Sequence, residues 1–218
     1  TGDSKELLET MVRPWIVGFL RERGLTLSEE KTKIVHIDEG FDFLGWNFRK
    51  YGGKMLIKPS KKNVKAFYDK VKGVIERSHS VPPERLIRQL NPVLRGWAEY
   101  HKGVVAKSTF SKLDHRLRWR LLRWGLRRNP RKTVQWVVDH FWRTFGSRQE
   151  FVGKYRDRNG NSALRLLLKL ADTKIVRHVK VKGEYNPFDP AWEAYWEKLP
   201  TTRMSHDIWE GKRFKLWV

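Results

Sequence analysis

The clearest hydrophobic pattern in the chain lies between Ser108 and Asn129, where apolar and cationic residues separate into two stripes. At about 100° per residue, each stripe covers a sector of roughly 80° on a helix. The apolar stripe contains Phe110, Leu113, Leu117, Leu121 and Trp124, and the cationic stripe contains Lys112, Arg116, Arg120, Arg123 and Arg127. A lesser apolar sector contains Trp119, Leu122 and Leu126. The pattern predicts a helix that packs between two neighbours and is open mainly along its cationic edge.

The cationic stripe has two possible interpretations, a solvated helix face and a surface that binds phosphate. Solvated helix faces usually mix signs, because pairs of opposite charge four residues apart support a helix and like charges at that spacing oppose each other. The stripe has no acidic member. A one-sided row of Lys and Arg is typical of an electrostatic footprint for phosphate, so we favour a phosphate-binding edge over a solvated face.

The segment before residue 60 predicts one helix and three short strands. Ser4 is a suitable N-cap for a helix that ends at Gly24, with a kink expected at Pro14. The expected strands cover residues 32–37, residues 41–49 with a bend at Gly45, and residues 54–58 after a turn at residues 51–53. These elements are too few for an independent core.

From residue 60 to residue 129 the pattern is helical. Ser60 is expected to cap a first helix, and the Pro82–Pro83 pair to begin a second. Asn91 followed by Pro92 resembles an N-cap with proline at the first helical position, so a fresh helix is predicted there, ending at His101. With the striped helix, these elements predict a small bundle with short loops.

Residues 130–218 predict a small mixed module. Thr133 can cap a helix, residues 146–160 are rich in Gly and Arg and predict a loop, and residues 174–181 alternate as in a strand. An extended loop over residues 185–190 and a short aromatic helix from Trp192 follow, and the tail from Thr201 has no clear pattern. The fold class expected for the whole chain is α+β and mainly helical.

Composition supports a polyanionic partner. The 218 residues contain 46 Lys plus Arg against 24 Asp plus Glu, a formal net charge of +22. Repulsion on this scale favours binding to nucleic acid, with an anionic membrane surface as the alternative. No apolar run approaches the ~20 residues of a membrane-spanning helix, and Thr1 does not begin a signal peptide. The absence of Cys excludes disulfides and thiol chemistry and fits a reducing, cytoplasmic setting inside the cell.

Residue patterns for catalysis are weak. The seven His have no metal-ligand spacing, and Asp38, Glu39 and Asp42 flank a turn, where Asp is common for conformational reasons. No Gly-rich phosphate loop is present. From the residues alone the chain is a binding module, with no metal or cofactor site of its own.

Three segments resemble group II intron-encoded reverse transcriptases, also called maturases. They are the run from Leu25 to Ile34 (LTLSEEKTKI), the run from Phe41 to Trp46 (FDFLGW), and the run from Leu90 to His101 (LNPVLRGWAEYH). The resemblance implies that residues 1–59 are the C-terminal end of the palm, residues 60–129 the helical thumb or X domain, and residues 130–218 a DNA-binding domain and tail. The run from Val179 to Pro190 also resembles the end of that last region.

The chain departs from this family in its catalytic motif. The polymerase signature Tyr-Ala-Asp-Asp is expected just before Thr1 and is absent, so the resemblance places the Mg²⁺ site in a palm segment outside this chain. Many relatives also end in a cysteine-rich endonuclease domain, and the run from Phe214 to Val218 resembles the approach to one, although the chain contains no Cys. The chain therefore resembles the C-terminal portion of an RNA-directed DNA polymerase, and we expect it to be inactive alone.

The resemblance also implies roles for single residues. Lys31 corresponds to a palm lysine that would assist pyrophosphate departure, with an ordinary surface lysine as the alternative. The turn Phe43-Leu44-Gly45-Trp46 corresponds to the primer grip, with a core hairpin as the alternative. The expected nucleic-acid-binding residues are Lys61, Lys62, Lys65, Arg95, Tyr100, His101, Lys107, Lys112, Arg116, Arg120, Arg123 and Arg127. Tyr100 and His101 are expected to stack on unpaired bases, whereas burial in the core is favoured for Trp97.

Three functional hypotheses follow. The leading one is a maturase fragment that binds intron RNA and template–primer duplex, aids splicing, and supports mobility by reverse splicing and target-primed reverse transcription. Its partners would be intron RNA, a DNA target and the N-terminal finger and palm half of the enzyme, with no membrane. The alternatives are a free-standing RNA-binding splicing factor and a generic basic nucleic-acid-binding module.

Overall fold

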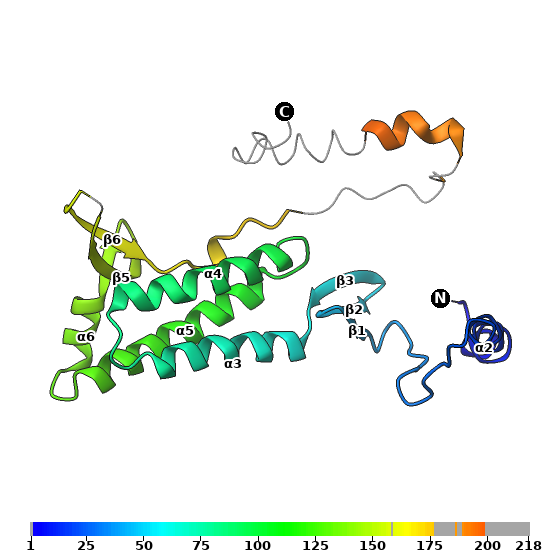
Figure 1. The fold of residues 1–218 in the computed structure, drawn as a ribbon, viewed down its shortest axis with the longest axis horizontal. Coiled ribbons are helices and arrows are strands. Elements are labelled where there is room, and N and C mark those ends of the chain that lie inside the picture. The colour runs from blue at the N-terminus through cyan, green and yellow to red at the C-terminus, as the bar shows by residue number, and fades with distance from the viewer. Residues whose placement is uncertain (1, 158, 177–185, 187–188, 199–218) are drawn as a thin grey trace. The chain divides into compact units, whose positions relative to one another are not determined.

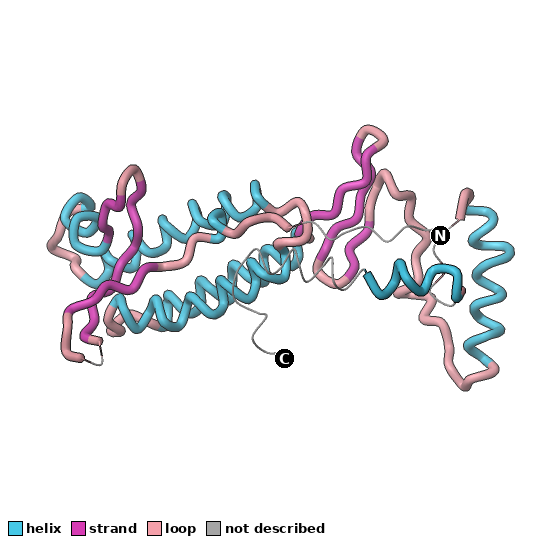
Figure 2. Tube along the Cα trace, turned by 90° about the horizontal axis from the view of Figure 1, so that it is seen from above, coloured by secondary structure: helices cyan, strands magenta, loops and turns pink. Residues whose placement is uncertain are grey.

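The computed structural model describes residues 2–157, 159–176, 186 and 189–198, whose elements form two compact units (Figure 1). The first unit covers Thr1–Gly73 and the second Val74–Val218. The division falls inside the helix α3 (Lys61–Arg77). Each unit contains one three-stranded sheet, and Figure 2 shows the strands of both sheets in magenta.

The first unit begins with a helix that is interrupted before Pro14. Ser4 caps α1 (Lys5–Leu7), because its Oγ accepts a hydrogen bond from the Leu7 N–H at 3.1 Å. A π-helical turn, η1 (Leu8–Val12), then leads into α2 (Arg13–Arg21), where Pro14 occupies the first turn. Proline lacks an N–H, and the wider turn before it is one way to accommodate that loss. α2 ends at Arg21, and Gly24, with φ of +69°, closes the turn that follows it, close to the predicted end.

The sheet of the first unit is an antiparallel meander of β1 (Phe41–Phe43), β2 (Trp46–Tyr51) and β3 (Lys54–Pro59). The turn at residues 52–53 is confirmed, and Tyr51 pairs with Lys54 across it. Two other predictions are wrong. Residues 32–37 form no strand, and the expected bent strand over residues 41–49 is a hairpin.

The hairpin differs from a bent strand because of its two central residues. Leu44 and Gly45 have φ of +48° and +80°, the left-handed conformations that a two-residue hairpin turn requires. A Cβ on residue 45 would also lie 2.8 Å from the side-chain amide nitrogen of Asn63, so a larger residue there would require the Asn63 side chain to move.

The helices α3, α4 (Pro83–His101), α5 (Lys107–Arg128) and α6 (Val134–Phe141) follow. Ser60 caps α3 through its Oγ, which accepts from the Asn63 N–H at 3.2 Å, and Thr133 caps α6 in the same way. Both caps were predicted. The expected break at Asn91–Pro92 is wrong, because α4 continues through Pro92.

The side chain of Asn91 explains why no cap forms at this point. Its amide nitrogen donates to the Leu166 carbonyl at 3.0 Å, and its amide oxygen accepts from the Leu168 N–H at 2.9 Å. Asn91 therefore ties α4 to a distant segment instead of capping a helix. Pro92 has no N–H and cannot donate the backbone hydrogen bond that is normal inside a helix. Packing of the surrounding residues must offset this loss.

The predicted loop over residues 146–160 is wrong, because most of it is a strand. β4 (Trp142–Phe145), β5 (Arg148–Arg156) and β6 (Ser162–Leu166) form an antiparallel sheet in that order. Gly153 lies in the middle of β5, where an added Cβ would be 2.3 Å from the backbone nitrogen of Glu84. The glycine therefore permits close approach of β5 to the first turn of α4 and does not mark a loop. Short 3₁₀ turns, η2 (Leu170–Asp172) and η3 (Pro190–Trp192), complete the described elements, and residues 193–198 are helical.

The core of the second unit lies between its helices and β5. Buried side chains from α4 and α5 dominate it, and Val137, Phe141 and Phe151 extend it towards the sheet. The helical members are Leu86, Ile87, Leu90, Leu94, Phe110, Leu113, Leu117 and Leu121. The fold is α+β and mainly helical, as predicted; the predicted strand over residues 174–181 lies mostly outside the described residues, as do most of residues 185–190 and all of the tail from Thr201.

Candidate nucleic-acid interface

The orientation of α5 is set by its apolar stripe. Phe110, Leu113, Leu117, Leu121 and Trp124 are all buried, as their spacing predicted. The Trp124 indole N–H also donates to the Ser78 carbonyl at 2.8 Å. Packing on this side directs the opposite side of α5 away from the core.

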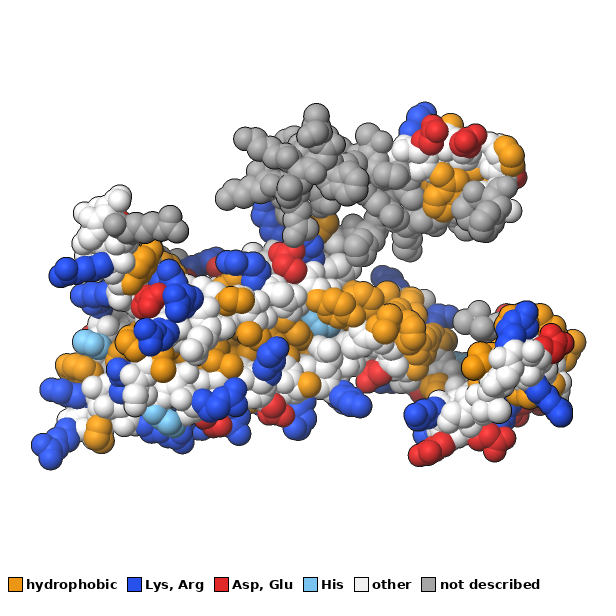
Figure 3. All heavy atoms as spheres, in the orientation of Figure 1, with side chains coloured by type: hydrophobic (Ala, Val, Ile, Leu, Met, Phe, Trp, Pro, Cys, Tyr) orange, Lys and Arg blue, Asp and Glu red, His pale blue; other side chains and the backbone are white. Residues whose placement is uncertain are grey.

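The cationic stripe lies beside the apolar stripe, about 100° around the helix from it at the helical spacing. Its five members are Lys112, Arg116, Arg120, Arg123 and Arg127, and all are exposed except the half-buried Arg120. The acidic residue of α5, Asp114, lies on the other side of the helix, about 160° from Arg116 at the helical spacing. Lys and Arg side chains are spread over the helices of the second unit in Figure 3.

One member of the stripe meets a carboxylate that the sequence pattern did not reveal. The Nη1 atom of Arg120 lies 3.4 Å from Oε1 of Glu76, near the end of α3. The ion pair partly neutralises Arg120 and fixes its position. The sequence of α5 alone could not predict this ion pair, because Glu76 is 44 residues away from Arg120 in the chain.

A shallow hollow lies between the stripe and the end of α3. Arg120, Arg123 and Arg127 line it from α5, opposite Ile75, Glu76 and His79. Arg128 holds the connection after α3 in place, because its guanidinium donates to the carbonyls of His79 at 2.9 Å and Val81 at 2.7 Å. The hollow is therefore a mainly cationic surface feature with a fixed wall, and its volume of about 10 Å³ is no larger than one water molecule needs.

His101 is a correction to the expected set of base-stacking residues. Its side chain is 0% exposed, so in this structure no base can reach it. Its ring lies 4.4 Å from that of Trp97, and burial lowers the pKa of His101 from 6.5 to about 4. Trp97 itself is half-buried, and only Tyr100 of this group is exposed.

Lys107 has a structural role that sequence reasoning missed. Its ammonium donates to the Ala171 carbonyl and, at 3.1 Å, to the Thr173 carbonyl. These bonds tie the first turn of α5 to the segment after η2. The remaining predicted cations on helices, Lys61, Lys62, Lys65 and Arg95, are exposed, and Lys65 pairs with Asp69 at 2.6 Å.

The residues expected to act near the polymerase centre lie in the first unit. Lys31 is exposed on the loop before β1. Phe43, Leu44, Gly45 and Trp46 are brought together by the β1–β2 turn, where Phe43 and Leu44 are exposed and Trp46 is half-buried. The turn presents backbone and apolar side chains to solvent, and its expected role stays a prediction.

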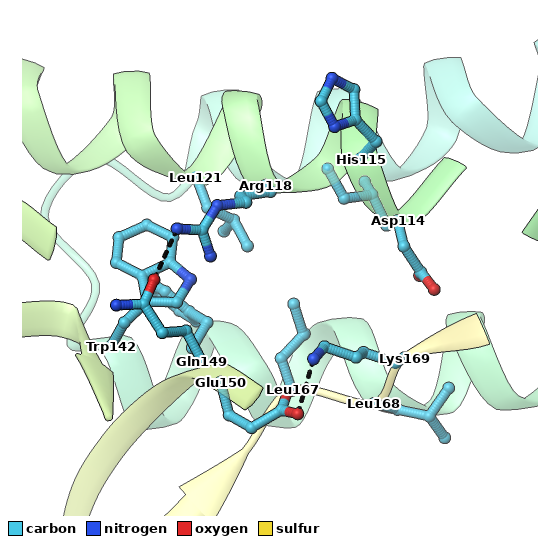
Figure 4. Close-up of a pocket in the computed structure, with 12 residues that line it drawn as sticks. Asp114, His115, Arg118, Leu121, Trp142, Gln149, Glu150, Leu167, Leu168 and Lys169 are labelled. Carbon is cyan, nitrogen blue, oxygen red and sulfur yellow. Dashed lines mark hydrogen bonds and ion pairs between the residues drawn. The ribbon is translucent and has the colours of Figure 1, made fainter. Parts of the chain in front are cut away.

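A cavity of about 200 Å³ lies between α5 and the second sheet (Figure 4). Its polar lining groups are largely partnered with each other. The Lys169 ammonium lies 2.6 Å from the Glu150 carboxylate, and the Arg118 guanidinium donates to the Gln149 side chain at 2.8 Å. Asp114 accepts from the backbone N–H groups of Leu170 and Ala171, at 2.9 and 2.8 Å.

The polar groups that line this cavity hold α5 and the second sheet together. Burial raises the pKa of the Asp114 carboxyl, whereas its two backbone hydrogen bonds act in the opposite direction. The lining comes from α5, β4, β5 and the segment after β6, so no sequence motif marked it. Because its polar groups are largely hydrogen-bonded within the chain, the cationic stripe is the stronger candidate for contact with a polyanion.

No group of three or more His, Asp or Glu side chains that could hold a metal ion occurs among the residues that the structure describes. Within the same residues, the helices are all too short or too polar to cross a membrane.

The geometry defines a strongly cationic, mainly helical module with a small sheet packed on its helices. Residues 64–142 match the family model described as "Group II intron, maturase-specific domain". The match runs from the second turn of α3 to the first residue of β4. Residues 64–142 are therefore similar to a group II intron maturase-specific domain, and the resemblance to group II intron maturases is confirmed for this part of the chain.

Two curated relatives have similar sequences. The protein named "Maturase-like protein 1" of Euglena gracilis is 32% identical over 97 residues, which are 43% of this chain and 21% of the relative. The protein of the same name from Euglena longa is 31% identical over 103 residues, 46% of this chain and 21% of the relative. The chain thus spans about a fifth of the length of these relatives.

Proposed function

We propose that this chain acts in the splicing of a group II intron by binding the intron RNA, and that the cationic stripe of α5 contacts the RNA backbone. The observation that carries the proposal is a one-sided row of Lys and Arg on the helix at the centre of the maturase-specific domain. A stripe of this kind neutralises phosphates and releases their counterions. The net charge of +22 supports the same partner.

The wider role follows from the family. As part of a larger intron-encoded reverse transcriptase, the chain would also grip template–primer duplex and a DNA target during reverse splicing and target-primed reverse transcription. Lys31 and the β1–β2 turn would act there, beside a finger and palm half that supplies the Mg²⁺ site. We place this enzyme inside the cell, in a bacterial or organellar setting.

The test is the salt dependence of RNA binding after removal of three charges from the stripe. We choose Arg116, Arg123 and Arg127, each changed to Gln, because Gln keeps helix propensity and Arg120 remains to pair with Glu76. The slope of log K against log salt concentration should become shallower by about one unit, or slightly less, for each lost phosphate contact. Binding is measured by filter retention over a salt series with a group II intron RNA.

A matched variant separates specific contact from general charge. Arg85, Arg88 and Arg131 are exposed cations outside the stripe, and changing all three to Gln lowers the net charge by the same amount. We expect a much smaller change of slope for this control. An unchanged slope in the stripe variant, with the helical circular dichroism intact, would exclude the stripe as a binding face.

Affinity ranking separates the alternatives. A maturase should prefer folded intron RNA to plain duplex RNA and to DNA. Equal affinity for all three, together with equal effects of the stripe and control variants, would instead favour a generic basic module.

A further inference from the structure

Trp119 lies in an environment that its sequence pattern did not predict. Its spacing with Leu122 and Leu126 predicted a packed apolar sector, and both leucines are half-buried. Trp119 is 52% exposed. The described residues do not cover this large aromatic side chain, so a partner molecule can reach it.

The polar edge of the indole is already satisfied. The Nε1–H of Trp119 donates to Nε2 of His115 at 3.0 Å, and the two rings lie 6.1 Å apart at 75°. Within the described part of the chain, no cation and no other aromatic ring contacts this indole. His115 therefore fixes the orientation of the side chain while more than half of its surface stays open.

The position of Trp119 on α5 places it at the border of the cationic stripe. It follows Arg116 by three residues and precedes Arg123 by four, so it is a surface neighbour of both on the helix. Surrounding cations disfavour a cationic or neutral protein partner and favour an anionic one. A nucleic-acid strand carries both the phosphates that suit the arginines and the flat bases that suit an indole.

We infer that Trp119 is a stacking platform for an unpaired base of the RNA whose backbone lies along the cationic stripe, with His115 as the residue that positions the indole. The inference rests on the proposed RNA binding and adds a base contact to the phosphate contacts. Sequence-specific RNA recognition usually targets unpaired bases, because the bases of a duplex are stacked away from side chains. The platform would thus direct the chain to loops or bulges of the folded RNA.

The test compares Trp119→Ala with the full chain on two RNA probes. One probe is a hairpin with a single-stranded loop that carries 2-aminopurine, and the other is the fully paired duplex of the same stem. We expect Trp119→Ala to weaken binding to the loop probe roughly 5- to 150-fold, the range that corresponds to loss of one base–aromatic stack. Binding to the duplex should change less than twofold, and the quenching of 2-aminopurine on binding should be lost.

Two further variants control for trivial effects. Trp119→Phe keeps an aromatic face and should recover most of the affinity and quenching. Trp15→Ala removes another exposed tryptophan, 71% exposed, from a helix outside the matched domain and should change neither. All variants should retain the melting temperature of the parent chain, because neither indole is buried.

The outcomes also separate this inference from the proposed function. If the stripe variant loses its salt slope while Trp119→Ala binds the loop probe like the parent, RNA binding stands and the stacking platform is excluded. If Trp119→Ala weakens loop and duplex binding equally, base stacking is again excluded. If the stripe variant keeps its slope, the proposed function itself fails.

Discussion

The same pair of residues occurs at the same helical spacing in two places with opposite surroundings. Trp97 and His101 are four residues apart on α4, and His115 and Trp119 are four residues apart on α5. The rings of the first pair lie 4.4 Å apart and those of the second 6.1 Å. His101 is fully buried, whereas Trp119 is 52% exposed.

The neighbours of each pair explain the difference. The ring of Phe110, near the start of α5, lies 5.7 Å from that of Trp97 and meets it edge-on. Phe110 is itself fully buried, so the pair on α4 belongs to the core of the second unit. The pair on α5 is beside the cationic stripe and has no such cover among the described residues. Spacing alone therefore assigns neither pair to the core or to a binding surface.

The largest change of unfolding free energy in this comparison should come from truncating Phe110, which packs on the Trp97–His101 pair of α4. Phe110→Ala leaves a cavity beside Trp97 in a close-packed region, and such changes cost about 3–5 kcal/mol of unfolding free energy. Trp119→Ala, a larger truncation by volume, should stay within ~0.5 kcal/mol because the side chain is exposed. Urea denaturation followed by circular dichroism measures both. Similar losses for the two variants would show that Trp119 is buried in solution.

The next effect concerns the pH dependence of stability that His101, the buried histidine of the α4 pair, should cause. The pKa of His101 is about 4 in the folded chain and 6.5 is its ordinary value, so below pH 6.5 the unfolded chain takes up a proton that the folded chain excludes. The stability linked to His101 is therefore complete above pH 6.5 and is lost as the pH falls towards 4. At ~1.4 kcal/mol per pKa unit, the loss reaches at most about 3 kcal/mol.

The measurement is the unfolding free energy between pH 7 and pH 4 for the parent chain and for His101→Gln. We expect His101→Gln to flatten the profile, since Gln is of similar size and does not titrate in this range. A parent profile without a decline over this range, or an unchanged profile in His101→Gln, would contradict burial of a neutral histidine.

The parts of the fold that sequence predicted correctly are those set by local chemistry. The apolar stripe of α5, the caps at Ser60 and Thr133, and the glycine turn after β2 depend on residues close together in the chain. The errors arise where distant residues decide. Asn91 binds a segment more than 70 residues away, and Gly153 makes room for the backbone of α4, so neither marks the boundary that its residue type suggested.

The same difference between local and distant determinants applies to the candidate site. The cationic stripe could be predicted from helical periodicity, and four of its five members are exposed because they lie outside the buried apolar stripe. The partner of Arg120 is on another helix, and the exposure of an aromatic residue depends on what lies above it. For this reason the sequence predicts that His101 contacts bases and that Trp119 is packed, whereas the structure shows His101 buried and Trp119 52% exposed.

The smallest expected effect tests whether the hydrogen bond of the exposed pair matters. His115→Ala removes the acceptor of the Trp119 N–H but leaves the indole in place. An exposed hydrogen bond of this kind contributes little to folding, so the unfolding free energy should change by less than ~0.5 kcal/mol. Affinity for the loop probe should fall by less than in Trp119→Ala, because the stacking surface remains and only its orientation is lost. If His115→Ala weakens loop binding as much as Trp119→Ala does, His115 contacts the RNA directly, and the two residues of the exposed pair act together on the ligand as Trp97 and His101 act together in the core.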